Sequence, residues 1–421
     1  MNYHKYLIGP YNLHIIKTNQ FKKDVITIDF RRKTKKEEIT LRNFLSNILI
    51  KSTNNYPTER LMNIKREELY DVKYSSGTSI SGNNMILYFE MQMLNEKYTE
   101  KGNFEKSFLF LMDMLFHPNI IKKGFQEEQF LLAKEEIKNN IESITESANG
   151  LATLHLLETM DKKSPFSFRA DGYLEDLEKI TPNKLYKYYL DVLQSDTVDI
   201  YIAGNVDVNK VKKLVTEYFF IKTIKKPIGS HFLYHDKFRK RAKTVIEKTD
   251  FHQSQLRIGL KLINLTEFER KYVLNIYNYI LGGGPDSLLF KVVREKNSLC
   301  YSISSHVSKV FNIMTIKAGI NAKDFKKAVK LIRKELKNME NGKFTEEDIE
   351  KAKTVYTSSF LSILDSPSNL IGLYEACEYF DWDLVEERIM NTKKVTKEMV
   401  LAVSKKIKLD TIYLLEGEQD G

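Results

Sequence analysis

Apolar residues along this chain follow two periodicities, and together they predict a mixed fold. Segments such as DTVDIYIAG (196–204) and SQLRIGLKL (254–262) alternate or run apolar over a few residues, which is typical of strands. Between such strands the apolar residues recur at helical spacing, and the helical segments come in pairs rather than singly. Paired helices between strands favour layered α+β domains over a doubly wound parallel sheet.

The order of these elements repeats once, at an offset of about 215 residues, half the chain. ITPNKLYKYYLDVLQSDTVDIYIAG (180–204) and VTKEMVLAVSKKIKLDTIYLLEG (395–417) each open with a β-branched residue and Thr, which predicts a helix N-cap. Each continues as an amphipathic helix, Asp-Thr and an apolar strand that ends at Gly. Two further pairs keep their order, a strand followed by a helix and then a long charged helix: 84–115 with 311–339, and 125–143 with 345–362.

The repeat predicts two related domains, at residues 1–222 and 243–421. Residues 223–242 between them contain Pro227, Gly229 and charges of both signs, a composition that indicates a linker. Each domain is expected to hold an antiparallel-rich sheet covered by helices on one face.

Composition excludes several other classes of protein. The chain of 421 residues is 42% hydrophobic and 29% charged, with 23 Tyr and 24 Phe, so long disordered spans are not expected. No apolar run approaches the roughly 20 residues that a membrane span needs, and the N-terminus does not read as a signal peptide. Cys300 and Cys377 form no CxxC pair, so we expect idle thiols in a reducing cytoplasm rather than a cysteine metal site.

The net charge of +10 raises the question of nucleic-acid binding. The basic residues alternate with acidic ones along the helices, as in KDFKKAVKLIRKELKNMENGKFTEEDIEKAK, and this pattern favours solvated helix faces. No zinc finger, RNP motif or single basic block supports a nucleic-acid partner, so this class stays a minor alternative.

Two local motifs invite a chemical interpretation. His231 and His235 have HxxxH spacing, but only Phe-Leu-Tyr lies between them and the segment falls in the predicted linker, which disfavours a metal site. Gly282–Ser287 (GGGPDS) lacks the Lys and Ser/Thr that end a phosphate loop, and it predicts a turn between two helices. No Ser/His/Asp or Cys/His arrangement is recognisable from spacing.

The segment LGGGPDSLLFKVVREKNSLCYSISS (281–305) resembles the C-terminal half of the insulinase-type, pitrilysin-like (M16) peptidases, which include the mitochondrial processing peptidase. That family carries a Gly-Gly-Gly turn, a helix ending in Arg-Glu, and Tyr-Ser on the following strand; the matching residues are Arg294 and Tyr301. The end of the first half is similar to the family as well. The resemblance implies two homologous sheet-plus-helix domains closing like a clamshell.

The first half departs from the family where the family binds zinc. The HxxEH motif places two His one helical turn apart on the metal and a Glu beside the bound water. Here Asn43 and Asn47 stand at the His positions and Ser46 at the Glu position. The family's third ligand would fall near Glu135 or Glu136. One carboxylate does not make a zinc site, so neither a metal nor another cofactor is expected.

The resemblance therefore implies a catalytically silent subunit. In the family Arg294 and Tyr301 would face a zinc site and hold peptide, which implies peptide binding and a heterodimer with a zinc-carrying paralogue. The main alternative is a purely structural scaffold subunit, in which the two residues serve packing. Intrinsic peptidase activity is disfavoured because all three motif residues are replaced.

Overall fold

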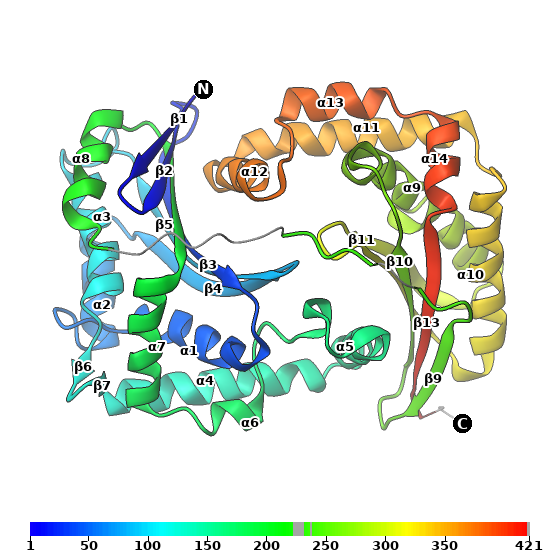
Figure 1. The fold of residues 1–421 in the computed structure, drawn as a ribbon, viewed down its shortest axis with the longest axis horizontal. Coiled ribbons are helices and arrows are strands. Elements are labelled where there is room, and N and C mark those ends of the chain that lie inside the picture. The colour runs from blue at the N-terminus through cyan, green and yellow to red at the C-terminus, as the bar shows by residue number, and fades with distance from the viewer. Residues whose placement is uncertain (222–230, 236–237, 419–421) are drawn as a thin grey trace. The chain divides into compact units, whose positions relative to one another are not determined.

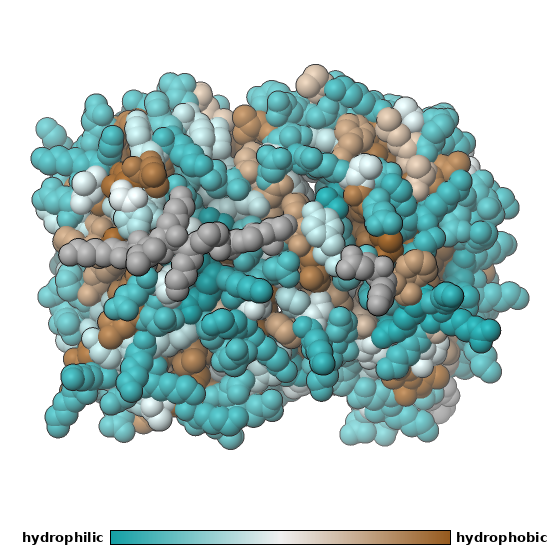
Figure 2. Space-filling model, viewed as in Figure 1, coloured by the Kyte–Doolittle hydropathy of each residue, from teal (hydrophilic) through white to brown (hydrophobic). Residues whose placement is uncertain are grey.

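The computed structural model describes residues 1–221, 231–235 and 238–418, and these form two compact units. Unit 1 comprises residues 1–142, 169–231 and 364–376; unit 2 comprises 143–168, 232–363 and 377–421. Hydrophilic side chains predominate on the face shown in Figure 2. Within the described ranges, no helix has both the length and the apolar character to cross a membrane.

Unit 1 is built on a six-stranded sheet (Figure 1). Its order is β1-β2-β8-β3-β5-β4, and only β2 and β8 run parallel. The strands are β1 (Asn2–Ile8), β2 (Tyr11–Lys17), β3 (Lys23–Lys33), β4 (Lys73–Ser81), β5 (Asn84–Leu94) and β8 (Thr197–Gly204). A separate small hairpin joins β6 (Ile120–Ile121) to β7 (Gly124–Phe125).

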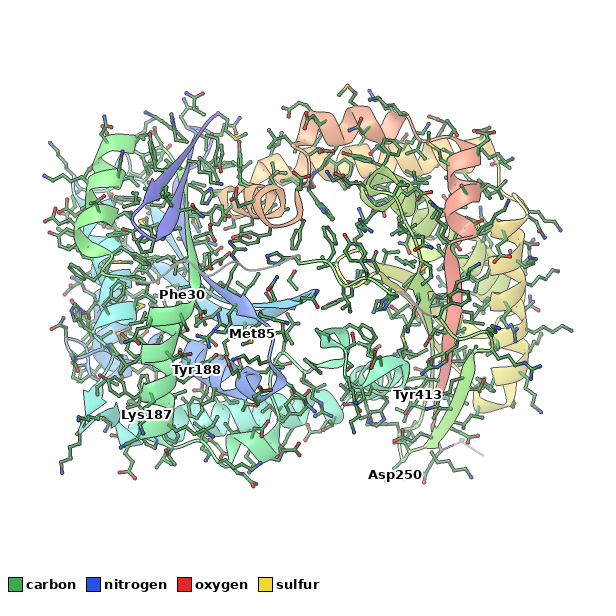
Figure 3. All side chains as sticks on the ribbon, in the orientation of Figure 1. Phe30, Met85, Lys187, Tyr188, Asp250 and Tyr413 are labelled. Carbon is green, nitrogen blue, oxygen red and sulfur yellow. The ribbon has the colours of Figure 1, made fainter. Side chains whose placement is uncertain are left out.

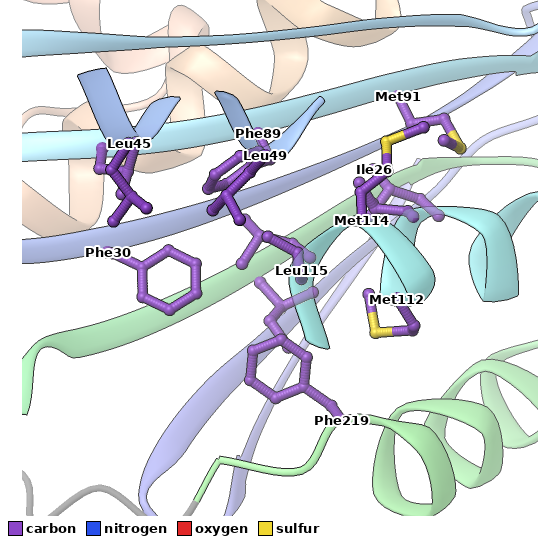
Figure 4. Close-up of a cluster of buried hydrophobic side chains, with 14 of the residues drawn as sticks. Ile26, Phe30, Leu45, Leu49, Phe89, Met91, Met112, Met114, Leu115 and Phe219 are labelled. Carbon is purple, nitrogen blue, oxygen red and sulfur yellow. The ribbon is translucent and has the colours of Figure 1, made fainter. Parts of the chain in front are cut away.

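Alternation along the strands gives this sheet one apolar and one polar face. On β3, Ile26, Ile28 and Phe30 enter the core while Asp29 and Arg31 point to the other side. Helices cover the apolar face and fill the core with Phe, Leu and Met side chains (Figure 4). The helices of unit 1 are α1 (Ile39–Leu49), α2 (Glu59–Glu68), α3 (Asn103–Phe116), α4 (Glu127–Thr145), α6 (Leu174–Leu177), α7 (Pro182–Ser195) and α8 (Val208–Tyr218). The last three residues of α4 belong to unit 2, because the first segment of unit 1 ends at residue 142.

A buried ion cluster joins α1 to the sheet. Asp196 lies fully buried at the junction of α7 and β8, and it accepts hydrogen bonds from Arg42 of α1 (2.6 Å) and from Arg32 of β3. Arg42 is itself 1% exposed and also donates to the carbonyl of Phe30 and the hydroxyl of Tyr188. A single side chain therefore fixes the position of α1 on three neighbouring elements.

The polar face of this sheet is covered by a segment from the other half of the chain. Residues 364–376, which include the start of α12 (Pro367–Phe380), bring Tyr374 onto the ring of Tyr3 with centroids 4.2 Å apart. They also bring Glu375 close to Asp29, Glu90 and Asp199, and burial followed by repulsion from these carboxylates raises the pKa of Glu375 to about 9. The Glu375 carboxyl group is therefore protonated at neutral pH.

Unit 2 repeats the same sheet plan. Its order, β9-β13-β10-β12-β11, matches β2-β8-β3-β5-β4 strand for strand, with one parallel pair, β9 and β13, in the corresponding place. The strands are β9 (Lys243–Lys248), β10 (Ser254–Leu262), β11 (Cys300–Ser308), β12 (Ile313–Ile320) and β13 (Ile407–Glu416).

Helices lie on both faces of this second sheet, so the expectation of helices on one face is wrong here: α5, which comes from the first half of the chain, covers the second face. α5 packs on one face, against β10 and β13, and the remaining helices lie mainly on the other face (Figure 1). Tyr413 of β13, labelled in Figure 3, belongs to the cluster under α5. The helical segments are α5 (Ala148–Asp161), α9 (Leu274–Asn278) between the π-helical turns Glu269–Val273 and Tyr279–Gly283, the π-helical Phe290–Glu295, α10 (Phe325–Glu340), α11 (Glu346–Ser362), α13 (Val385–Lys393) and α14 (Lys397–Ser404).

The structure confirms the predicted fold class of two homologous sheet-plus-helix domains. The predicted Thr caps are present: Thr181 accepts a hydrogen bond from the Lys184 amide and Thr396 from the Met399 amide. The linear boundaries 1–222 and 243–421 stay a prediction, and the compact units are grouped differently, because 143–168 and 364–376 each pack with the opposite half. Of the predicted linker, residues 223–230 and 236–237 lie outside the described residues.

Removing Arg42 should weaken unit 1 strongly. Arg42→Met leaves Asp196 buried with one cation instead of two, and we expect the free energy of unfolding to fall by about 3–5 kcal/mol. Urea denaturation followed by circular dichroism measures this loss. Arg66→Met is the matched control, because its ion pair with Asp71 is largely solvent-accessible and should contribute less than about 1 kcal/mol. Equal losses in both variants would contradict the structural role of Arg42.

Glu375 should make the protein less stable as pH rises. Its folded pKa of about 9 lies above the unfolded value, so the proton is kept on folding and stability declines between about pH 5 and pH 9. Glu375→Gln keeps the neutral shape, and its melting temperature should exceed that of the wild type increasingly with pH. Calorimetry at pH 5.5, 7 and 8.5 tests this, with the exposed Glu128→Gln as control. Parallel curves for wild type and Glu375→Gln would show that Glu375 is ionised in the fold.

Candidate functional site

The three residues at the zinc-motif positions lie on α1 and bond to nearby backbone. Asn43 donates its side-chain amide to the carbonyl of Asp171 at 2.8 Å. Ser46 and Asn47 both direct hydrogen bonds to the carbonyl of Asn43, at 2.7 and 3.4 Å. The carbonyl of Ser46 in turn accepts from the hydroxyl of Ser76 on β4. The bonds of Asn43 to Asp171 and of Ser76 to Ser46 therefore tie the helix to its neighbours, whereas those of Ser46 and Asn47 to Asn43 stay within the helix.

The carboxylates expected near this helix do not complete a metal site. Glu135 and Glu136 are exposed on α4, and Glu136 forms an ion pair with Lys51 just beyond α1 at 2.7 Å. Amide groups such as those of Asn43 and Asn47 are poor substitutes for imidazole as zinc ligands. Throughout the described ranges, no group of three or more His, Cys, Asp or Glu side chains is placed to hold a metal. The residues present do not fit zinc.

The two other motifs have structural roles. His231 belongs to unit 1, where its Nε2 lies 3.1 Å from a guanidinium nitrogen of Arg31, and burial with this neighbouring charge lowers the pKa of His231 to about 4. His235 belongs to unit 2, where Nε2 bonds the carbonyl of Phe311 at 2.9 Å. Gly282–Ser287 forms the turn between two helical segments, as its sequence indicates.

Arg294 and Tyr301 meet on the surface of unit 2. Arg294 lies near the end of the π-helical segment, and Ser298 turns the chain into β11 with a left-handed φ of 51°. The guanidinium carbon of Arg294 lies 4.4 Å from the ring centroid of Phe290 and 5.4 Å from that of Tyr301. Among the described residues, the Arg294 side chain has no hydrogen bond or ion pair, so its in-plane N–H groups remain available.

A β-bulge exposes the Tyr301 side chain. Between Cys300 and Ile303, β11 has one residue more than the facing stretch of β12, so the register shifts there. Tyr301 is 83% exposed, and together with Ser302 and Gly319 it lines a cavity of about 460 Å³ in unit 2. A side chain kept only for packing would be buried, whereas most of the Tyr301 side chain is accessible beside this hollow.

Other polar residues of this cavity were not predicted from the sequence. Asn149 comes from α5, Arg257 from β10 and Lys317 from β12. Arg257 interrupts the apolar run SQLRIGLKL, and this was the one signal in the sequence that could have marked it. Asn149 joins it only through the packing of α5 on β10, and Lys317 only through the register of β12 with β10.

Comparison with known proteins supports the resemblance. Residues 179–356 match the family model described as "Peptidase M16 inactive domain". A Bacillus subtilis (strain 168) protein described as "Probable inactive metalloprotease YmfF" is 29% identical over 98% of this chain and 97% of its own length. A second protein of that strain, "Uncharacterized zinc protease YmxG", is 25% identical over 62% of this chain and 61% of its own length.

Solved structures share the fold over the full length. A conserved protein from Enterococcus faecalis V583 superposes with a TM-score of 0.94 at 28% identity, and each chain is covered completely. A structure from Pseudomonas fluorescens, described as a peptidase M16 inactive domain, has a TM-score of 0.81 at 15% identity, again with complete coverage of both chains. The second likeness shows the fold alone.

The chain purified without partners should contain no stoichiometric zinc, because amides and a hydroxyl stand where the zinc ligands and the base would be. Inductively coupled plasma mass spectrometry after dialysis against micromolar zinc gives the metal content, and cleavage of a quenched fluorescent peptide gives the activity. One tightly retained zinc ion per chain would show that other residues have replaced the motif.

Proposed function

We propose that this chain, which is similar to the M16 peptidases but lacks that family's zinc motif, is a silent subunit that binds peptide for a zinc-carrying partner chain. In this proposal Arg294 and Tyr301 hold the peptide while the partner, an M16 paralogue with an intact HxxEH motif, performs the cleavage. The observation that carries the proposal is the exposure of Tyr301 beside Arg294 at the edge of a cavity.

The geometry of the pair suits peptide carbonyls. Phe290 and Tyr301 contact the guanidinium of Arg294 through their rings, which limits its motion without consuming its N–H donors. The Tyr301 hydroxyl adds a donor that can stabilise negative charge as it develops on a carbonyl oxygen. Two donors on adjacent side chains can therefore bind one peptide segment.

The relatives also support a division of labour between two chains. The same strain of Bacillus subtilis has one relative described as an inactive metalloprotease and one described as a zinc protease. We propose that the partner of the present chain is of the second kind.

Losing either donor should slow cleavage by the assembled complex. Arg294→Ala removes the carbonyl donors and Tyr301→Phe removes only the hydroxyl, and each should lower kcat/KM by about 10²–10³-fold, as expected for a lost oxyanion donor. The measurement is peptide cleavage by the complex reconstituted with the HxxEH chain. Zinc content and the association of the two chains, followed by analytical ultracentrifugation, should stay unchanged.

Matched controls separate these roles from general damage. Lys296→Ala removes an exposed cation two residues from Arg294, and Tyr98→Phe removes a hydroxyl from a Tyr that is 48% exposed in unit 1. Both controls should cleave at the wild-type rate. Wild-type rates for Arg294→Ala and Tyr301→Phe as well would leave the scaffold alternative as the explanation of the pair.

A further inference from the structure

Arg257 carries a buried positive charge without a carboxylate partner among the described residues. It is 2% exposed, and its hydrogen bonds go to neutral acceptors: the hydroxyl of Thr153, the carbonyl of Leu256, the side chain and carbonyl of Asn149, and the side chain of Gln255. Burial lowers the pKa of Arg257 only to about 10, so it remains cationic at neutral pH. Nη1 has two N–H groups and a single bond to Leu256, which leaves one donor for a ligand.

The corresponding face of unit 1 neutralises its arginine internally. There Arg31 of β3 bonds Asp199 through Nε at 3.1 Å and through a second nitrogen. A buried charge with no counter-ion is costly, and in proteins it is normally paired. Arg257 on the equivalent strand β10 has no carboxylate partner among the described residues. Its positive charge therefore favours binding of an external anion, whereas the charge of Arg31 is already paired.

Two neighbouring features increase this positive potential. Lys317 of β12 stands directly opposite Arg257 in the antiparallel register, and like charges in facing positions repel. The bonds of Arg257 to Asn149 place its guanidinium at the first turn of α5, the end of a helix that favours anions. Lys317 is exposed, and it has no ion pair within the part of the chain that the structure describes.

Arg257 and Lys317 line the cavity that Tyr301 borders. Its other walls include the hydroxyl of Ser302 and the side-chain amides of Gln253 and Asn149, all capable of donating hydrogen bonds to an anion. Gly319 leaves this space open, because a Cβ there would come within 2.9 Å of the Gln253 side chain. Two cations and several neutral donors therefore converge on one hollow with no acidic residue in its lining.

We propose that this cavity binds a carboxylate group of the peptide that Arg294 and Tyr301 hold, and so selects acidic peptides or peptide C-termini. The inference rests on the proposed peptide-binding function, since a carboxylate is the anionic group that an unmodified peptide carries. Arg257 receives the missing counter-ion from the ligand, and Lys317 adds attraction at the mouth. Tyr301 connects the two parts, because it borders the cavity and contacts Arg294.

Four fluorescein-labelled nonapeptides of one sequence test this proposal. Each has either a free or an amidated C-terminus, and either Glu or Gln at its central position, so the set distinguishes a C-terminal carboxylate from a side-chain one. Fluorescence anisotropy with the full-length chain should show the preferred carboxylate peptide binding about 10–100-fold more tightly than its neutral counterpart, the effect of one charged hydrogen bond.

Variants then locate the effect. Lys317→Ala should weaken binding of the preferred peptide about 2–5-fold and leave the neutral peptides unchanged, since an exposed charge contributes modestly. Lys330→Ala, an exposed Lys on α10 of the same unit, is the matched control and should change nothing. Arg257→Met should abolish the preference for a carboxylate. If circular dichroism shows that this variant is unfolded, Lys317→Glu serves instead and should weaken carboxylate binding at least tenfold.

The possible outcomes separate the two proposals. Equal binding of all four peptides, unaffected by the Lys317 variants, would overturn the carboxylate site and leave peptide binding intact. Absence of binding by every peptide at millimolar concentration would overturn the carboxylate site and the peptide-binding role together. A carboxylate preference that Lys317→Ala and Lys330→Ala reduce equally would reflect net charge alone and would also overturn the site.

Discussion

The bonds that Arg42 and Arg32 both donate to buried Asp196 position α1, the helix that carries Asn43, Ser46 and Asn47 at the zinc-motif positions. Asp196 is fully buried between α7 and β8, and Arg42 reaches it from the middle of α1. In a zinc-bearing relative the metal itself would tie this helix to its neighbour, as the HxxEH motif implies. Here the chain uses only its own side chains, because Lys51 meets Glu136 and Asn43 meets the Asp171 carbonyl. In this chain α1 is therefore held by hydrogen bonds and ion pairs between its own residues and their neighbours.

The two sheets have the same strand plan but opposite electrostatics on their second faces. In unit 1, Arg31 meets Asp199, and Glu375 is kept protonated among further carboxylates. In unit 2, Arg257 and Lys317 have no acidic neighbour in their cavity. A duplicated fold thus has one polar face on which the buried arginine is paired with a carboxylate, and one on which the buried arginine bonds only neutral groups among the described residues.

Much of the fold could be predicted from the sequence because its signals are local. Strand alternation, the Thr181 and Thr396 caps and the order of elements all lie within short windows, and the repeat makes each half evidence for the other. The absence of the zinc motif was equally visible at Asn43, Ser46 and Asn47. The grouping of 143–168 with unit 2 was not predictable, because it depends on packing between residues far apart in the chain.

The cavity around Arg257 could not be predicted from the sequence for the same reason. A single Arg in an apolar strand does not reveal its partners, since Lys317 becomes its neighbour only through the register of β10 and β12. The bulge that turns Tyr301 outward also needs both strands to be defined. By contrast, the pairing of Arg294 with Tyr301 could be anticipated, because a short turn connects their elements.

Residues 143–168 and 364–376 each pack with the opposite half of the chain, and this affects folding during synthesis on the ribosome. Unit 1 takes residues 364–376 as part of its structure, so its polar face stays uncovered until nearly the whole chain has been synthesised. Unit 2 likewise needs α5, which leaves the ribosome long before the sheet on which it packs. A domain made of one continuous segment can fold as soon as that segment has been synthesised. Contacts between residues far apart in the sequence slow folding and leave partly folded intermediates exposed. The nascent chain therefore exposes both sheet faces to solvent until its last helices are made.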